Sequence, residues 1–132
     1  MLKIPKIIHD DIVAHAKSGF PLEVCGILGG TAGEISVIYR MTNTDRSNEH
    51  FMMDPKEQFA VIKELRGKGL EMLAIYHSHP ETPARPSEED IRLALTPNVS
   101  YVIASLAEPE RPVVNSFRIS GDKVQPEPIE LV

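Results

Sequence analysis

The sequence YHSHPETPARPSEEDI, residues 76–91, decides how this chain folds, because it joins a strand to a helix through a loop with three prolines. The apolar run before it, LEMLAIYHSH (70–79), is nearly continuous, which is typical of a strand covered on both faces. After the loop, SEEDIRLALT (87–96) has the composition of a short helix. Side chains at i and i+2 of a strand project from the same face, so His77 and His79 are expected to lie side by side.

These two histidines present two neutral ring nitrogens to one point, which suits a metal ion better than a packed core. Zinc takes nitrogen and carboxylate ligands at about 2.0–2.2 Å, and catalytic zinc sites commonly keep three protein ligands and one water. Asp90 is the candidate third ligand if the loop 80–86 folds the helix start back over the strand end. The prolines limit the freedom of this loop and so reduce the entropy lost on assembling the site.

Helix capping is an alternative explanation for part of this pattern. Ser87 stands where an N-cap residue is expected, and Asp90 stands at the capping-box position three residues later. A single His-x-His, in turn, is more often a surface or core feature than a metal site. The two structural explanations are independent, however, and the two motifs lie side by side in the chain. Their combination favours a metal site at His77, His79 and Asp90.

A hydrolytic metal site also needs a group that moves protons, and Glu23 is the candidate. It stands at the head of EVCGILGG (23–30), an otherwise apolar segment with the character of a buried strand. Partial desolvation of a carboxylate raises its pKa toward the range useful for proton transfer near neutral pH. A solvated strand end is the alternative for Glu23, and the residues alone leave both open.

Together these residues resemble the JAMM motif of the MPN-plus (Mov34/PAD-1) metallopeptidases. That motif is an upstream glutamate followed by His-x-His-Pro, six residues, Ser, two residues and Asp. The matching positions here are Glu23, His77, His79, Pro80, Ser87 and Asp90. The resemblance implies that both histidines and Asp90 bind one zinc ion, with a water as fourth ligand. It also implies that Glu23 is the general acid/base and that Ser87 helps to stabilise the oxyanion.

The resemblance extends over nearly the whole chain and implies a fold and a substrate. The expected fold is a cytidine-deaminase-like (JAB1/MPN) α/β domain, with a mixed, curved sheet flanked by helices. The expected reaction is hydrolysis of the amide bond at the C-terminus of a ubiquitin-like protein adduct. Between Asp90 and SYVIASLA (100–107) there is no room for insertions that read a second ubiquitin. The chain therefore looks like the compact prokaryotic members, some of which act on ThiS- or MoaD-like sulfur-carrier proteins.

Two other functions remain alternatives. A zinc hydrolase or deaminase of a small molecule would share the metal chemistry but would need a closed pocket, and the deaminase signature His-x-Glu…Cys-x-x-Cys is absent. A non-catalytic protein-binding module that keeps zinc for structure would need a fourth protein ligand, and none is evident near Asp90.

Composition predicts a single cytoplasmic domain over residues 1–132. A hydrophobic fraction of 42% and a charged fraction of 25% are ordinary for a globular protein. The net charge of −5 argues against a nucleic-acid partner, since nucleic-acid binders usually carry a basic patch. No signal-peptide core or membrane-spanning stretch is evident. The one cysteine, Cys25, is expected to be a small buried residue, with a catalytic nucleophile as the alternative.

The helices follow from spacing and capping signals. Apolar residues at helical spacing from Ile4 to Ala16 predict a first helix, with Pro5 in its first turn and Gly19 just past its end. Asp54 is a suitable N-cap for a second helix over 55–69. The residues expected on one face of this helix are Phe59, Ile62 and Leu65.

The strands and minor signals complete the pattern. Besides 70–79, strands are expected at 23–30, 34–43, 100–107 and 113–120. Gly121-Asp122 suits a tight turn into a last segment whose prolines, Pro126 and Pro128, confine it to a sheet edge. The glycines of 26–33 are attributed to a strand and turn, because no phosphate-loop lysine follows them. The other histidines, His9, His15 and His50, are expected to be exposed or capping, and the Met52-Met53 pair to line a core or groove.

Overall fold

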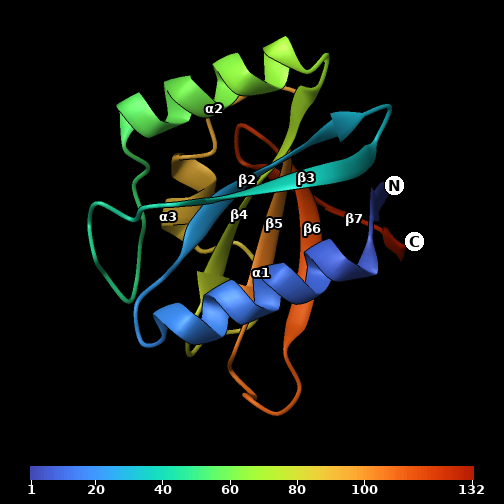
Figure 1. Cartoon of the computed structure of the whole chain (residues 1–132). Helices are drawn as coiled ribbons and strands as arrows, with labels where there is room; N and C mark the ends of the chain where they lie inside the picture. Colours follow the sequence, from blue (N-terminus) through green and yellow to red (C-terminus); the bar gives the residue numbers. More distant parts are fainter.

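A computed structural model describes residues 1–132 and shows one curved sheet with helices packed on it (Figure 1). The helices are α1 (Lys6–Gly19), α2 (Pro55–Gly67) and α3 (Glu88–Arg92). The strands are β1 (Leu2–Ile4), β2 (Cys25–Thr31), β3 (Glu34–Met41), β4 (Glu71–His79), β5 (Ser100–Ser105), β6 (Val113–Ser120), β7 (Lys123–Glu127) and β8 (Ile129–Leu131). No helix combines the length and the apolar character needed to cross a membrane.

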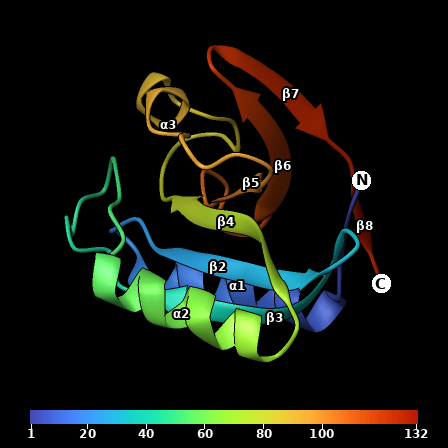
Figure 2. The same cartoon turned by 90° about the horizontal axis from the view of Figure 1, so that it is seen from above.

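The sheet is mixed and nearly closed on itself. Its strand order is β7-β6-β5-β4-β2-β3-β1-β8, so β7 and β8 lie at opposite edges. These two edge strands are nevertheless consecutive in the chain, with only Pro128 between them. The sheet must therefore curl until its two edges approach each other, as Figure 2 shows. The β4–β5 pair at the centre is parallel, and both of its neighbouring pairs are antiparallel.

Each face of the central strands packs on a different helix. One apolar cluster joins Ile12 of α1 to Leu28 and Tyr76, and the other joins Leu65 of α2 to Ile75. Burial on both faces explains why β4 is apolar along its length. The face of β4 that carries Ile75 continues through the next alternate residues, which are the two histidines.

Most expected elements are present, and the differences have local causes. The first helix begins at Lys6, with Pro5 as its N-cap, because residues 2–4 form the short strand β1. In α2 the N-cap is confirmed, since the Asp54 carboxylate accepts from the Lys56 amide at 3.0 Å. The prediction for Phe59 was wrong: its side chain is 72% exposed. The buried stripe of α2 is centred on Val61 and Leu65, and Phe59 lies off that stripe.

The C-terminal segment does more than form an edge. The expected turn is present, with Gly121 at φ 62°, and β7 is an edge strand as predicted. Residues 129–131, however, leave β7 and pair in parallel with β1. This pairing joins the two ends of the chain and holds the curl of the sheet.

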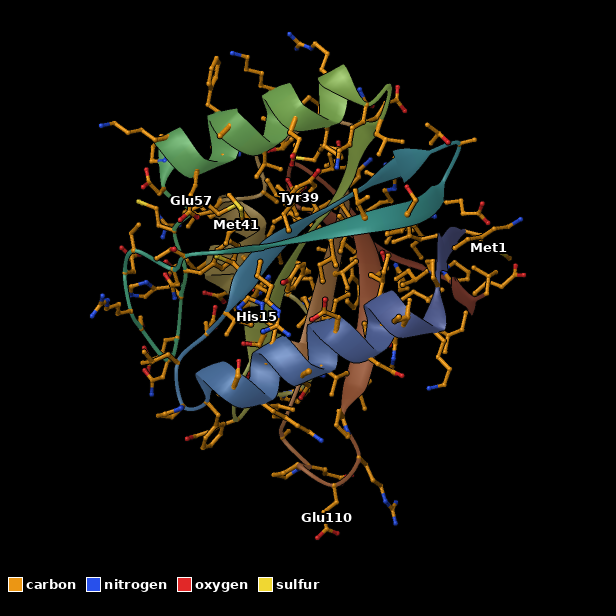
Figure 3. The ribbon with its side chains drawn as sticks, in the orientation of Figure 1. Met1, His15, Tyr39, Met41, Glu57 and Glu110 are labelled. Carbon is orange, nitrogen blue, oxygen red and sulfur yellow. The ribbon has the colours of Figure 1, made fainter.

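Close packing explains a glycine of β2. A Cβ atom on Gly26 would lie 2.0 Å from the Tyr76 ring, so only glycine fits there. The Tyr76 hydroxyl contacts His15 Nδ1 at 2.7 Å, and Figure 3 shows this histidine on the side of α1 that faces the sheet. The expectation of an exposed or capping His15 was therefore wrong. Its half-buried position lowers the pKa of its imidazole to about 4.

Candidate metal centre

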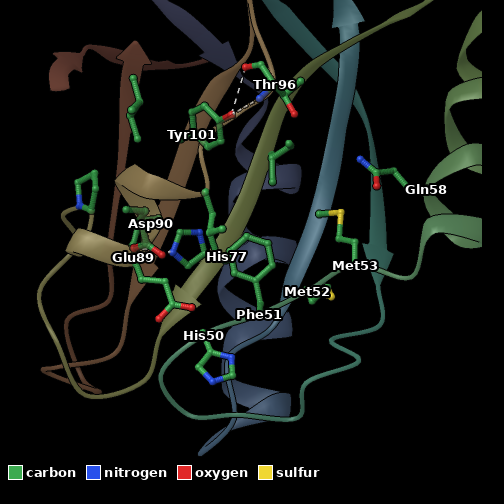
Figure 4. Close-up of a pocket in the computed structure, with 15 residues that line it drawn as sticks. His50, Phe51, Met52, Met53, Gln58, His77, Glu89, Asp90, Thr96 and Tyr101 are labelled. Carbon is green, nitrogen blue, oxygen red and sulfur yellow. Dashed lines mark hydrogen bonds and ion pairs between the residues drawn. The ribbon is translucent and has the colours of Figure 1, made fainter. Parts of the chain in front are cut away.

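Three side chains meet at the end of β4 and point at one another. His77 and His79 extend from the strand, and Asp90 comes from α3, which the proline loop folds back as expected. The two Nε2 atoms lie 3.1 Å apart, and Asp90 Oδ2 lies 3.2 Å from His77 Nε2 and 3.0 Å from His79 Nε2. Figure 4 shows His77 beside Asp90. These two nitrogens and one oxygen thus form a compact triangle of possible metal-ligand atoms.

The tautomer of the neutral His79 ring makes this triangle suitable for a cation. Its Nδ1 lies 2.8 Å from the carbonyl oxygen of Pro83, which can only accept, so Nδ1 carries the proton. In the neutral ring Nε2 then has only a lone pair, and it faces the lone pairs of Asp90 Oδ2. Buried lone pairs at this distance need a positive charge between them.

The distances also agree with a small metal ion. Zinc bonds of about 2.0–2.1 Å at the tetrahedral angle place ligand atoms about 3.3–3.4 Å apart. The observed separations of 3.0–3.2 Å are slightly shorter. Two imidazole nitrogens and one carboxylate oxygen form a donor set that zinc favours, so the residues fit this metal.

The electrostatics of the cluster favour the metal-binding forms of Asp90 and His77, whereas His79 must give up a proton to bind a metal. Burial alone would raise the pKa of Asp90, but hydrogen bonds from His77 and His79 outweigh it and hold that pKa well below its ordinary value. Burial lowers the pKa of His77, and the Asp90 carboxylate only partly opposes this. For His79, the Asp90 carboxylate and the Pro83 carbonyl outweigh burial and raise the pKa. A dication would replace the proton that His79 otherwise takes up.

Ser87 and Asp90 form the capping box that the sequence indicated. The Ser87 hydroxyl accepts from the Asp90 amide at 3.0 Å, and the Ser87 amide donates to Asp90 Oδ2 at 3.0 Å. The same Oδ2 faces both histidines, so capping and cluster formation use one carboxylate oxygen. The two explanations of Asp90 are therefore compatible. Ser87 itself is exposed beside the cluster.

Glu23 is buried, and the alternative of a solvated strand end was wrong. Its side chain precedes β2, is 4% exposed, and has an Oε1 atom with no hydrogen-bond partner. Burial raises the pKa of this carboxyl to about 8, and the charge of His79 partly opposes the rise. Ser78, between the two histidines, fixes this segment: its hydroxyl accepts from the Val24 amide at 2.8 Å. Its own amide donates to the Val24 carbonyl at 3.0 Å, so Glu23 is tied to the histidine strand.

An open, largely apolar pocket of about 250 Å³ adjoins the cluster (Figure 4). Phe51 forms part of its wall and stacks on the His77 ring, with centroids 4.6 Å apart. Met52 and Met53 line this pocket, which agrees with the groove-lining role expected for the pair. Its apolar lining further includes Ile75, Pro86, Leu93, Tyr101, Ile103 and Ile119.

Cys25 does not have the properties of a nucleophile. It is fully buried, and this burial raises the pKa of its thiol to about 12. The sequence-based expectation of a small buried residue is confirmed. Phe51, Ser78 and the carbonyl of Pro83 were not identified from the sequence, because their contacts with the histidines depend on the folded chain.

Several known proteins of similar sequence are named as a peptidase, a protease or a desampylase. A family model described as prokaryotic homologs of the JAB domain matches residues 5–120. The CysO-cysteine peptidase of Mycobacterium tuberculosis is 37% identical over 92% of this chain and 84% of its own length. A probable TtuB-protein conjugate cleaving protease of Thermus thermophilus is 35% identical over 78% of this chain and 69% of its own. The desampylase of Haloferax volcanii is 31% identical over 73% and 74% of the two chains.

Solved structures show the same fold. A Desulfitobacterium hafniense protein matches with a TM-score of 0.92 and 47% identity, covering 100% of this chain and 93% of that one. A JAB1/MPN domain protein from Archaeoglobus fulgidus matches with a TM-score of 0.70 over 99% and 97% of the two chains. At 21% identity, the second match bears on the fold alone. The predicted JAB1/MPN fold is confirmed.

Proposed function

This chain belongs to the family of prokaryotic homologues of the JAB domain, and on that premise we propose that it is a JAMM-type zinc hydrolase acting on protein adducts. Its substrate would be the amide bond at the C-terminus of a ubiquitin-like or sulfur-carrier protein. The observation that carries the proposal is the triangle of His77 Nε2, His79 Nε2 and Asp90 Oδ2 beside an open pocket. The relatives named above, a peptidase, a protease and a desampylase, support the reaction class.

We assign one zinc ion to His77, His79 and Asp90, with the fourth position left to water or substrate. When bound, zinc would lower the pKa of water to about 7 and polarise the scissile carbonyl. The protein residues supply the remaining parts of the site. The Pro83 carbonyl fixes the tautomer of His79, and Phe51 holds the plane of the His77 ring by stacking.

Glu23 is assigned the proton transfers. Its unpartnered Oε1 is the atom that would take a proton from the attacking water and give it to the leaving amine. A raised pKa suits both steps, because the carboxyl can then both accept and donate a proton near neutral pH. The tie between Val24 and Ser78 keeps this carboxyl next to the histidine strand.

The pocket favours a protein tail over the alternatives. It is open and mainly apolar, whereas a deaminase-like enzyme of a small molecule would need a closed site. A structural zinc site would need a fourth protein ligand, and the cluster supplies only three residues. A protein C-terminus could enter extended along the open pocket, with an apolar side chain against Phe51 and Met53.

A substrate panel tests the proposal. The zinc-loaded protein would be incubated with a sulfur-carrier protein bearing a C-terminal cysteine, with a ubiquitin-like protein linked to a lysine, and with a short acyl-cysteine amide. We expect cleavage of at least one protein adduct and no turnover of the short amide, measured by intact mass. Turnover of the short amide alone would favour the small-molecule alternative. No cleavage of any substrate by a zinc-loaded protein would contradict the proposed function.

Ser87 is assigned a role at the transition state in addition to its cap. The change Ser87→Asn should separate the two roles, because Asn caps helices as well as Ser but places its polar atoms elsewhere. We expect this variant to fold and bind zinc normally and to lose turnover by roughly 10²–10³, as when an oxyanion donor is removed. Turnover and thermal unfolding of the same preparation would be measured.

The matched variant is Ser87→Ala, which removes both the cap and the hydroxyl. It should lose about 1 kcal/mol of stability as well as turnover. Full turnover of the Ser87→Asn variant would show that the hydroxyl acts only as a helix cap.

A further inference from the structure

Two side chains outside the cluster anchor the proline loop between β4 and α3. The Ser105 hydroxyl at the end of β5 donates to the carbonyl oxygen of Thr82 at 2.6 Å. The Asn115 amide on β6 donates to the carbonyl oxygen of Ala84 at 3.1 Å. These donors lie 23 and 31 residues beyond the loop residues that they bind, so they connect separate parts of the chain.

Pro83 lies between the two anchored residues, and its carbonyl faces the metal cluster. This carbonyl accepts from His79 Nδ1 at 2.8 Å and thereby leaves Nε2 free for the cation. Three successive carbonyl oxygens of the loop are therefore bound by side chains from three strands. A proline has no backbone N–H, so Pro83 itself offers no donor that could hold the loop in place.

The sheet register places both anchors on the face that carries the metal ligands. Ser105 is the direct partner of His79 in the parallel β4–β5 pair. Ile103 is the partner of His77 on one side and of Asn115 on the other. Side chains that are directly paired across strands share a face, so the two histidines and the two anchors line the same surface.

Apolar packing holds the loop against this surface, but it is not directional. The Ala84 side chain is 7% exposed and packs in a small cluster with Ile103 and Phe117. Such a contact brings the loop close to the sheet but does not by itself orient the Thr82 and Ala84 carbonyls, while the Pro83 carbonyl also accepts from the Arg85 amide at 2.9 Å. The hydrogen bonds from Ser105 and Asn115 supply the direction that packing lacks.

We propose that Ser105 and Asn115 are positioning residues of the metal centre. By fixing the Thr82 and Ala84 carbonyls, they hold the Pro83 carbonyl against His79 Nδ1, so that His79 Nε2 faces the metal. The inference rests on the proposed function only in requiring that the cluster binds zinc. Loss of groups that orient a metal-binding histidine typically weakens metal affinity by about 10–100-fold.

The test compares two pairs of variants on the same two strands. Ser105→Ala and Asn115→Ala remove the anchors. The matched controls, Ser100→Ala and Ser116→Ala, each remove one buried hydroxyl of β5 or β6 that donates to Glu127, at 2.6 and 2.8 Å. Zinc affinity would be measured on metal-free protein by competition with a chromogenic chelator, and the cobalt-substituted proteins would be compared by visible absorption.

We expect zinc affinity to fall about 10–100-fold in the anchor variants and to stay at the wild-type level in the controls. Both pairs should lower the midpoint of thermal unfolding, because each variant loses at least one hydrogen bond, and Ser105→Ala also loses the one that its hydroxyl accepts from the Ala107 amide at 3.1 Å. The cobalt spectrum should change only in the anchor variants. Ser105→Thr keeps the hydroxyl and should restore both affinity and spectrum, which a merely structural role would not require.

The outcomes separate this inference from the proposed function. Wild-type affinity in the Ser105→Ala/Asn115→Ala double variant, or an equal loss in the Ser100 and Ser116 controls, would overturn the positioning role. A wild-type chain that binds no zinc would overturn it as well. A chain that binds zinc tightly, responds to the anchor variants and cleaves no conjugate would overturn the proposed function alone.

Discussion

A chain with both His77→Ala and His79→Ala is expected to bind no zinc and to lose all hydrolytic activity. The two Nε2 atoms and Asp90 Oδ2 are mutually within 3.2 Å, so removing both imidazoles leaves a single carboxylate ligand. One carboxylate does not hold zinc against water. Elemental analysis after dialysis against zinc would give the metal content, and cleavage of a protein adduct would give the activity.

A matched control replaces two other histidines. His9 and His50 each contact a neighbouring aspartate and lie outside the triangle, so the variant His9→Ala/His50→Ala should retain its zinc. Because the site histidines are buried, a folded reference is also needed. Asp90→Asn keeps an oxygen that can accept from the Ser87 amide, and it should fold yet bind zinc far more weakly. Full zinc retention in the His77/His79 double variant would refute the site assignment.

The clustering of His77, His79 and Asp90 could be predicted from the sequence because its geometry is local. Two residues at i and i+2 of a strand must share a face, so the His77–His79 pair needs no knowledge of the fold. Asp90 follows in the next element, after a loop too short to carry it far. The strand itself was recognisable from its apolar run, and its limits, Glu71–His79, match the expected segment closely.

The residues around the cluster could not be predicted, because non-local pairing brings them there. Asn115 approaches the proline loop only through the order β4–β5–β6, and no spacing in the sequence encodes that order. The pairing of 129–131 with β1 was missed for the same reason. Phe59 fits a helical period, but period alone did not determine which side of α2 meets the sheet.

Replacement of Glu23 by Gln should abolish most hydrolysis while leaving zinc and fold intact. General acid–base groups typically contribute about 10²–10⁴-fold to a rate, and the Gln side chain neither takes up nor releases a proton near neutral pH. The control Glu49→Gln removes an exposed acid whose charge also acts on Glu23, and its activity should stay near that of the wild type. Loss of zinc in the Glu23→Gln protein would make Glu23 a ligand, and an unchanged rate would make it structural.

The stability of the metal-free protein tests the same residue independently of catalysis. Burial holds the pKa of Glu23 at about 8 in the folded chain, above its ordinary value of 4.5. Folding therefore takes up a proton between these values, and the stability that this proton provides is lost as the pH rises through about 8. Glu23→Gln has no such dependence, so its melting temperature should gain on the wild type between pH 5 and pH 9. A carboxylate kept for structure would predict the reverse, a Gln variant that is the less stable protein at high pH. A melting-temperature difference that does not change with pH would show that the carboxyl is not desolvated, and the basis for its role in proton transfer would be lost.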